Sequence, residues 1–317
     1  MFTVCFPRVI HTHNMSIHLV TGASGLVGTQ LAAQLRAAGH EVHTLTTRPG
    51  KSPDPNIHYW SPETGLLDPM LLRGVSVVHH LAGASVSEKW TAKHRREILT
   101  SRQQGTDLLV DRLRALPAAE RPHTVVCASA VGIYPDQAAG TPLLTENDGH
   151  GTGFLADVVR QWELATDEFR SLGIRTVQLR IGIVLGQGGA LSAMLPLFRA
   201  GLGSTLGSGK QWMPWIHVED LGAAFVHASQ RETLDGVYNA VGVAPATNRD
   251  FSAVLARVLN KPFWAPAPPA FLLRLILGDR SVLVLGSTPA SSEKLCATGF
   301  VHRYTDLEAA LASVVKA

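Results

Sequence analysis

Short apolar runs alternate with amphipathic stretches through the first two thirds of the chain. Apolar runs at 17–20, 41–46, 76–83 and 123–130 are separated by longer segments, several of which repeat apolar residues with helical spacing. A further run at 175–186 follows another stretch with helical spacing. Strands that alternate with helices are typical of βαβ units, which place helices on both faces of a parallel sheet. The pattern therefore predicts an α/β fold with a doubly wound parallel sheet.

The pattern changes after residue 186. Residues 187–214 are rich in glycine and aromatic side chains, and 243–317 contain a proline-rich approach to an apolar helix. Between them, 215–242 return to a helix-like and then a strand-like pattern. We therefore expect a cofactor-binding core over 15–186, to which 215–242 return, and a smaller, interleaved C-terminal α/β lobe over 187–214 and 243–317.

Composition narrows the class of protein. The chain has 317 residues, 45% of them apolar, which allows a substantial core. Residues 1–14 lack the continuous apolar run of a secretory signal and are expected to be a disordered leader. No apolar run reaches the roughly 18 residues of a membrane span. Cys5, Cys127 and Cys296 are far apart and odd in number, which argues against a disulfide framework and favours a reducing cytoplasm.

Charge and histidine placement argue against several partners. The net charge is only +3, and the one basic cluster, KHRRE at 93–97, is interpreted as a solvated helix face. His79 and His80 end an apolar strand without a companion cluster, so packing or hydrogen bonding is a simpler role for them than metal ligation. We expect no nucleic-acid, membrane or metal partner, and a monomer or homodimer that acts on a small molecule.

The most informative motif is TGASGLVG at 21–28. Its glycines, Gly22, Gly25 and Gly28, lie between a strand-like run and a helix-like segment. Glycine in such a turn allows unusual backbone angles, lets the main chain approach a pyrophosphate, and lets the helix pack closely on the sheet. The first interval differs from the commonest fingerprint, G-x-G-x-x-G. The context predicts a dinucleotide-binding loop of the Rossmann type, with a tight turn that binds nothing as the alternative.

The end of the second strand-like run predicts which dinucleotide is bound. An NAD-preferring site usually carries Asp or Glu there for the ribose hydroxyls. This chain has TLTTRPG, in which Arg48 offers a planar positive charge suited to a 2′-phosphate and Thr47 adds a hydroxyl. NADP(H) is therefore favoured over NAD, with a solvated loop charge as the alternative interpretation of Arg48.

Several motifs together resemble a known superfamily. TGASGLVG at 21–28, HLAGA at 80–84, ASAVGIY at 128–134 and LRIGIVLG at 179–186 resemble, in order and spacing, the extended branch of the short-chain dehydrogenase/reductases. PWIHVEDLGAAFVHA at 214–228 is similar to a stretch of the NAD-dependent epimerase/dehydratase group. The whole set resembles an atypical subgroup, the nucleoside-diphosphate-sugar epimerase family, which is sometimes labelled cell-division-inhibitor-like. Its members end in a small C-terminal domain of unknown function.

The resemblance implies reduction or epimerisation of a small carbonyl or nucleotide-sugar substrate. Ser129 corresponds to the strand-end hydroxyl that hydrogen-bonds the substrate in active relatives, and Arg102 stands where an asparagine usually positions the catalytic lysine through water. With the positions argued above, the expected cofactor-binding residues are Gly22, Ser24, Gly25, Leu26, Val27, Thr47, Arg48, Leu81, Ala82, Gly83, Arg102, Ser129, Arg180 and Gly182.

The Tyr-x-x-x-Lys pair that this superfamily uses for proton transfer is missing. The segment expected to carry it, 149–169, contains neither tyrosine nor lysine. Counting back from Glu163 places Phe154 or Leu155 in the tyrosine slot and Val159 or Arg160 in the lysine slot. Phenylalanine and leucine cannot exchange a proton, and arginine is too basic to relay one. A non-catalytic, regulatory NADP(H)-binding protein is therefore the alternative function.

Three candidate catalytic residues remain: Ser129, Tyr134 and His217. A structural aromatic is the alternative interpretation of Tyr134, and His217 reaches substrate only if the C-terminal lobe folds over the cofactor. The glycine-containing run at 207–215 supplies the candidate substrate-binding residues, which are Lys210, Gln211, Trp212 and Trp215. A rigid plug between the lobes is the alternative interpretation of this run.

Overall fold

A seven-stranded parallel sheet forms the centre of the protein, seen in a computed structural model that describes residues 15–50, 52–138 and 140–315. The strand order is β10-β6-β5-β4-β1-β2-β3, so the chain runs outward in one direction from β1 and in the other from β4. This is the doubly wound order of a Rossmann fold, with its switch point between β1 and β4. The predicted fold class is confirmed. The strands are β1 (Ile17–Thr21), β2 (Glu41–Thr46), β3 (Ile57–Tyr59), β4 (Val75–His80), β5 (Thr124–Ala130), β6 (Arg175–Ile181) and β10 (Gly236–Ala240).

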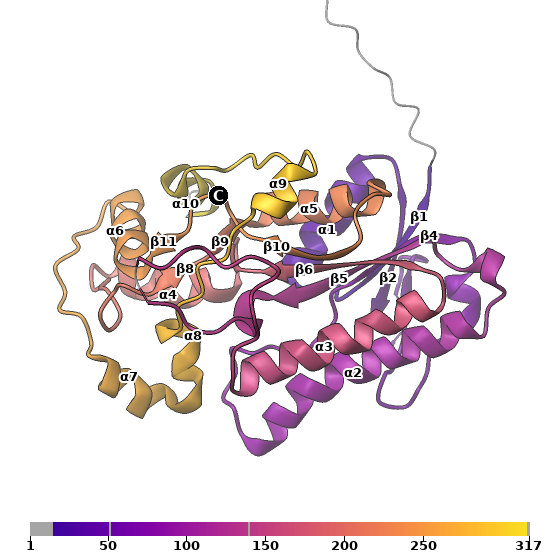
Figure 1. The fold of residues 1–317 in the computed structure, drawn as a ribbon, viewed down its shortest axis with the longest axis horizontal. Helices are drawn as coiled ribbons and strands as arrows, with labels where there is room; N and C mark the ends of the chain where they lie inside the picture. Colours follow the sequence, from indigo (N-terminus) through magenta and orange to yellow (C-terminus); the bar gives the residue numbers. More distant parts are fainter. Residues whose placement is uncertain (1–14, 51, 139, 316–317) are drawn as a thin grey trace, which may run out of the picture.

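Long helices cover both faces of the sheet (Figure 1). On one face α1 (Leu26–Ala37) packs against α5 (Val218–Gln230), and on the other α2 (Ala92–Arg114) lies beside α3 (Phe154–Ser171). Each face buries its own apolar cluster. Burial of this apolar surface is the main favourable term that holds the layers together, and it fixes the strand ends at which the candidate site is built.

The chain after β6 adds two small sheets and several short helices. Strand β7 (Ile183–Leu185) pairs parallel with β9 (Trp215–His217), and β8 (Trp212–Met213) pairs antiparallel with β11 (Ala246–Thr247). These elements bury a third apolar cluster that includes Trp215, Phe251 and Leu311. The helices of this part are α4 (Gly189–Arg199), α6 (Asn248–Val258), α7 (Ala270–Leu277), α8 (Val282–Leu285), α9 (Glu293–Ala297) and α10 (Leu307–Val315).

The prediction of one continuous strand over 175–186 is wrong. The run breaks at Gly182, after which β7 leaves the main sheet to pair with β9. A Cβ atom on Gly182 would lie 2.2 Å from the carbonyl oxygen of Pro214, so only glycine allows the two backbones to approach this closely. The amide of Ile183 then donates to that same oxygen at 2.6 Å. The break is therefore a tertiary contact between segments far apart in the sequence.

Some expectations concern features of the whole chain. Among the described residues, no helix is long and apolar enough to cross a membrane, and no group of three or more His, Cys, Asp or Glu side chains is placed to hold a metal ion. Cys127 and Cys296 are free thiols. The expected leader at 1–14 lies outside the described residues. The predicted domain boundaries stay predictions.

Candidate active site

The glycine-containing loop between β1 and α1 is a tight turn at the switch point of the sheet. Gly22 has φ +69°, and a Cβ atom there would lie 2.9 Å from the backbone carbon of Leu81. A Cβ atom on Gly28 would lie 2.3 Å from the carbonyl oxygen of Gly22. Helix α1 starts after Gly25, and no side chain caps it. The backbone N–H groups of its first turn can therefore donate hydrogen bonds to a ligand. Ser24 and Gly25 are exposed on this turn.

Two exposed residues follow the carboxyl end of the neighbouring strand, β2. They are Thr47 and Arg48, and the Arg48 amide donates to the Thr46 hydroxyl at 3.2 Å. None of the ion pairs among the described residues includes Arg48. Its guanidinium is therefore available to a ligand that reaches past β1 to β2.

A buried hydrogen-bond chain supports the loop after β4. The Thr21 hydroxyl accepts the N–H groups of residues 81–82, both at 3.1 Å, and lies 2.8 Å from His80 Nδ1. His80 Nε2 lies 3.1 Å from the Thr106 hydroxyl, whose own proton goes to the Arg102 carbonyl. Because the Thr106 hydroxyl donates to Arg102, it must accept from His80, which places the ring proton of His80 on Nε2. Burial, with a contribution from the Arg102 charge, lowers the pKa of His80 to about 4, so the ring is neutral near pH 7.

Gly83 leaves room for the side chain of Arg102. A Cβ atom on Gly83 would lie 3.0 Å from Arg102 Cζ. Arg102 Nη1 donates to the carbonyl oxygens of Ala84 at 3.1 Å and Ile98 at 2.9 Å, and its guanidinium lies 4.8 Å from the Trp162 ring centroid. The predicted cofactor-binding residues Gly83 and Arg102 are therefore in contact with each other.

Ser129 belongs to a second buried network, between β5, β6, β10 and α3. Its hydroxyl donates to Glu163 Oε1 at 2.5 Å. Arg180 Nε and Nη2 donate to the two oxygens of Glu163 at 2.8 and 2.9 Å, and Arg180 Nη1 donates to the Tyr134 hydroxyl at 2.8 Å. Tyr134 in turn donates to Asn239 Oδ1 at 2.8 Å. The network is closed, because each of these strong donors already has an acceptor.

This network limits what its members offer a ligand. The single hydroxyl proton of Ser129 is used by Glu163, so the oxygen presents lone pairs and accepts rather than donates. Burial raises the pKa of Tyr134, although the Arg180 charge acts in the opposite direction, so Tyr134 is a neutral phenol near pH 7. Burial opposes the charge of Arg180, but its pairing with Glu163 still raises the pKa of Arg180 above its usual value.

Comparison with known proteins agrees with this architecture. Residues 18–241 match the NAD dependent epimerase/dehydratase family, and residues 268–314 match a domain of unknown function, DUF1731. The chain belongs to the NAD dependent epimerase/dehydratase family. The predicted resemblance, including the C-terminal domain, is confirmed.

Relatives align over nearly the whole chain. The epimerase family protein YfhF of Bacillus subtilis is 34% identical over 299 residues, which are 93% of this chain and 97% of YfhF. The crystal structure of human epimerase family protein SDR39U1 with NADPH has a TM-score of 0.82 and 30% identity, and the match covers 95% of this chain and 99% of that one. A nucleoside-diphosphate sugar epimerase from Corynebacterium glutamicum has a TM-score of 0.75 and 29% identity, over 95% of this chain and 58% of that one.

In this epimerase/dehydratase family member, the expected tyrosine and lysine slots hold groups that cannot relay a proton. Phe154, at the start of α3, packs its ring 4.9 Å from Trp90 and 4.7 Å from the Arg95 guanidinium. Val159 is buried in an apolar cluster. Arg160 is exposed and pairs with Asp157 at 3.1 Å. Of the expected slots, Phe154 and Val159 therefore hold packed apolar side chains, and Arg160 holds an exposed ion pair.

His217 lies between the start of α5 and the C-terminal helix α10. Its Nδ1 accepts the amide of Glu219 at 3.2 Å, and its Nε2 lies 3.0 Å from the Ser313 hydroxyl. The ring stacks on Tyr304 with centroids 3.7 Å apart. Burial lowers the pKa of His217 even though acidic neighbours oppose this. Both ring nitrogens are thus committed to protein partners.

The four candidate substrate-binding residues have different surroundings. Gln211 is buried and donates to the carbonyl oxygens of Leu206 and Val284. Trp215 is 1% exposed and belongs to the third apolar cluster. Lys210 is exposed and Trp212 is half-buried. Gln211 and Trp215 are therefore committed to internal contacts, whereas Lys210 is open to solvent.

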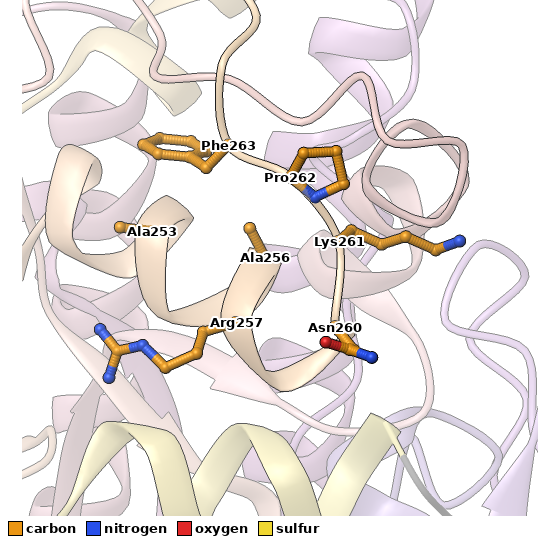
Figure 2. A pocket seen from close by; sticks show the side chains of 7 residues that line it. All are labelled: Ala253, Ala256, Arg257, Asn260, Lys261, Pro262 and Phe263. Carbon is orange, nitrogen blue, oxygen red and sulfur yellow. The ribbon is translucent and has the colours of Figure 1, made fainter.

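A shallow groove of about 440 Å³ lies elsewhere, along α6 (Figure 2). Its lining residues are Ala253, Ala256, Arg257, Asn260, Lys261, Pro262 and Phe263. Arg257 is already paired with Glu308 at 2.6 Å. Helix α6 lies among the C-terminal elements, away from the glycine loop and the ends of the central strands (Figure 1), so this groove is not part of the candidate site.

Sequence reasoning missed the partners of the buried polar residues. Trp162 and Glu163 entered the sequence analysis only through the family resemblance and the counting of positions, and no sequence pattern indicated that Thr106 or Asn239 would be a hydrogen-bond partner. One signal was available for the ion pair: Glu163 and Arg180 are opposite charges within segments predicted to form buried elements. Charged side chains are rarely buried unless they are paired, so an ion pair between these two residues could have been predicted.

Proposed function

We propose that this protein binds NADP(H) at the turn between β1 and α1 and acts as an oxidoreductase or epimerase on a small carbonyl or nucleotide-sugar substrate. The observation that carries the proposal is the turn itself. Its glycines allow the backbone segments of the turn to approach one another closely. The uncapped start of α1 offers N–H donors at the topological switch point. Human SDR39U1 was solved with NADPH, and the similar C. glutamicum protein is a nucleoside-diphosphate sugar epimerase.

The residues present fit a dinucleotide phosphate. Gly22, Ser24 and Gly25, with the backbone of 26–27, would hold the pyrophosphate, and Thr47 and Arg48 would hold the 2′-phosphate of the adenosine ribose. Support for NADP over NAD comes from Arg48, which follows β2, is exposed and forms no ion pair within the described part of the chain. The bound nicotinamide would supply or accept the hydride.

Ser129 would contact the reacting oxygen of the substrate. A substrate hydroxyl would donate to Ser129 Oγ while Ser129 keeps its bond to Glu163. A substrate carbonyl requires a donor, so the Ser129 hydroxyl would have to turn away from Glu163 to serve it. The present geometry therefore favours binding of an alcohol over binding of a ketone.

The second candidate function is a regulatory protein that binds NADP(H) without turnover. The observation that favours it is the apolar packing of Phe154 and Val159 where the proton relay would lie. In either case we place the protein in a reducing compartment such as the cytoplasm, which is consistent with the free thiols of Cys127 and Cys296.

One experiment separates these functions. Purified protein is incubated with NADPH and a panel of carbonyl compounds and sugar nucleotides, or with NADP⁺ and alcohols, and absorbance of the reduced nicotinamide is followed. Turnover that disappears in Ser129→Ala, with NADPH affinity retained, supports the enzyme. If NADPH binds but no compound of the panel is turned over, the regulatory function is supported. Absence of NADPH binding contradicts both.

A further inference from the structure

Two arginines, Arg102 and Arg180, are largely buried near the carboxyl ends of the central strands, but only Arg180 has a counter-ion among the described residues. Arg180 is held on both of its sides by protein groups, with Glu163 as its carboxylate. Arg102 takes part in none of the ion pairs among the described residues. The hydrogen bonds that its side chain donates within the described protein all start from Nη1 and end on backbone carbonyls.

A cation in this position is energetically unfavourable without an anion. Backbone carbonyls and the face of Trp162 compensate part of the lost hydration, but they carry no net charge. Burial lowers the pKa of Arg102 to about 10, so the side chain is still charged near pH 7. Within the described protein, Nε and Nη2 of Arg102 have no acceptor, and the side chain stays partly exposed.

The guanidinium lies next to the loop that borders the dinucleotide turn. Gly83 contacts Arg102, and the backbone of Leu81 in the same loop contacts Gly22. The Ala84 carbonyl accepts from Arg102, while the Ala84 amide donates to the Ser101 hydroxyl at 2.9 Å. One short loop therefore links the turn to Arg102, and a ligand that covers this loop would come within reach of the free side of the guanidinium.

We propose that Arg102 provides the counter-charge for a phosphate oxygen of the bound ligand, either a phosphate of NADP(H) or a phosphate of the substrate. This inference rests on the proposed function. It differs from the usual role of an asparagine at this position, because an asparagine carries no charge and cannot neutralise an anion.

A purely structural role for Arg102, as a clamp on the loop after β4, makes a different prediction. Arg102→Gln retains a donor for the Ala84 carbonyl and removes the charge, Arg102→Met retains an apolar stem without a donor or charge, and Arg102→Lys retains the charge. The matched control is Arg112→Gln. Arg112 lies on the same helix and also donates only to backbone carbonyls, those of Leu67 and Gly65, but its partners belong to a different loop.

The first measurement is the dissociation constant of NADPH, followed by its fluorescence at low and high salt. If the anion is a cofactor phosphate, both uncharged variants weaken binding by about tenfold or more and reduce its salt dependence, since a charge-assisted bond is lost. We expect Arg102→Lys to retain more affinity than either uncharged variant because it keeps the positive charge, and Arg112→Gln to match the unmodified protein. Thermal unfolding shows whether each variant is folded. If Arg102→Gln does not fold, Arg102→Met is used as the uncharged variant.

The second measurement locates the anion if NADPH affinity is unchanged. Uridine diphosphate and inorganic phosphate are titrated into protein saturated with NADPH. A tenfold loss of affinity for either probe in Arg102→Gln assigns the anion to the substrate. Unchanged affinity for NADPH and for both probes overturns the inference. Failure of the unmodified protein to bind NADPH overturns the proposed function instead, and the uridine diphosphate titration on the protein alone then decides the role of Arg102.

Discussion

The carboxyl edge of the sheet has two sides whose polar groups are satisfied in different ways. On the glycine-loop side, formed by residues 22–28, Arg48, 81–84 and Arg102, the start of α1 has no side-chain cap, and neither arginine is paired with a carboxylate of the described residues. On the serine side, formed by Ser129, Tyr134, Glu163, Arg180 and Asn239, the strong donors are all bonded within the protein.

The difference shows where a ligand would complete the structure. A largely buried charge without a counter-ion, such as Arg102, is costly, and a bound anion would remove that cost. The exposed Arg48 and the exposed start of α1 are hydrated and remain available to a ligand. A closed network needs no partner and rigidifies the fold. The glycine-loop side therefore has the features of a binding site, whereas the serine side has the features of a structural support. Within that support, the Ser129 hydroxyl bonds to Glu163 and would also contact the substrate.

The largest expected effect comes from breaking the closed network. Glu163→Ala leaves the buried Arg180 without its carboxylate, and we expect the free energy of unfolding to fall by about 3–5 kcal/mol. Urea denaturation measures this change. The control is Asp157→Ala, which breaks the exposed pair with Arg160 and should cost about 0.5 kcal/mol or less. Equal losses in the two variants would show that the network is not the support described above.

Acid should weaken the support of the loop after β4. The pKa of His80 is about 4 in the folded protein because of burial and the nearby Arg102, against 6.5 in an unfolded chain. Between these values the unfolded chain binds more protons, so stability is full above about pH 6.5 and falls as the pH drops toward 4, by about 3 kcal/mol from this group.

Urea denaturation at pH 7.5, 6.0 and 5.0 tests the contribution of His80. His80→Gln should reduce the slope of unfolding free energy against pH, while His150→Gln, at an exposed position, should leave it unchanged. Other buried histidines, such as His18 with a pKa lowered to about 3 mainly by burial, keep part of the slope. A slope that is identical in His80→Gln and the unmodified protein would refute this assignment.

A side chain in the glycine turn should disturb binding more than folding. Gly28→Ala places a Cβ atom 2.3 Å from the Gly22 carbonyl oxygen, so the turn must shift. We expect a loss of about 1–3 kcal/mol in stability and loss of measurable NADPH binding. Gly149→Ala, where a Cβ atom meets nothing within 4 Å, is the control. Tight NADPH binding by a folded Gly28→Ala variant would place the cofactor elsewhere.

The smallest effect concerns the choice of cofactor. We expect NADPH to bind about tenfold or more tightly than NADH, a difference of about 1.4 kcal/mol or more, because Arg48 pairs with the 2′-phosphate. Arg48→Ala should reduce this ratio toward one and leave NADH affinity unchanged. Isothermal titration of both nucleotides checks this, and Arg36→Ala, at the end of α1, serves as a charge-matched control. Equal affinities in the unmodified protein contradict the NADP assignment.

The strands were predictable where their burial is visible as an apolar run in the local sequence. Parallel strands covered on both faces consist of apolar runs, and β1, β2, β4 and β5 were found on that basis. Strand β3 was missed because it is a three-residue edge strand with two exposed residues. The break at Gly182 was missed because its cause is the approach of Pro214, which no local pattern reveals.

The sequence by itself determined the chemical inventory of the site: the spaced glycines, Arg48 in place of an acidic residue, and the absence of tyrosine and lysine from 149–169. Only the tertiary structure decided which polar groups are paired. Glu163 and Arg180 are 17 positions apart, and Tyr134 and Asn239 are 105 positions apart. Hydrogen bonds and ion pairs act over a few ångströms, so the fold alone paired Arg180 and left Arg102 with no counter-ion among the residues that the structure describes.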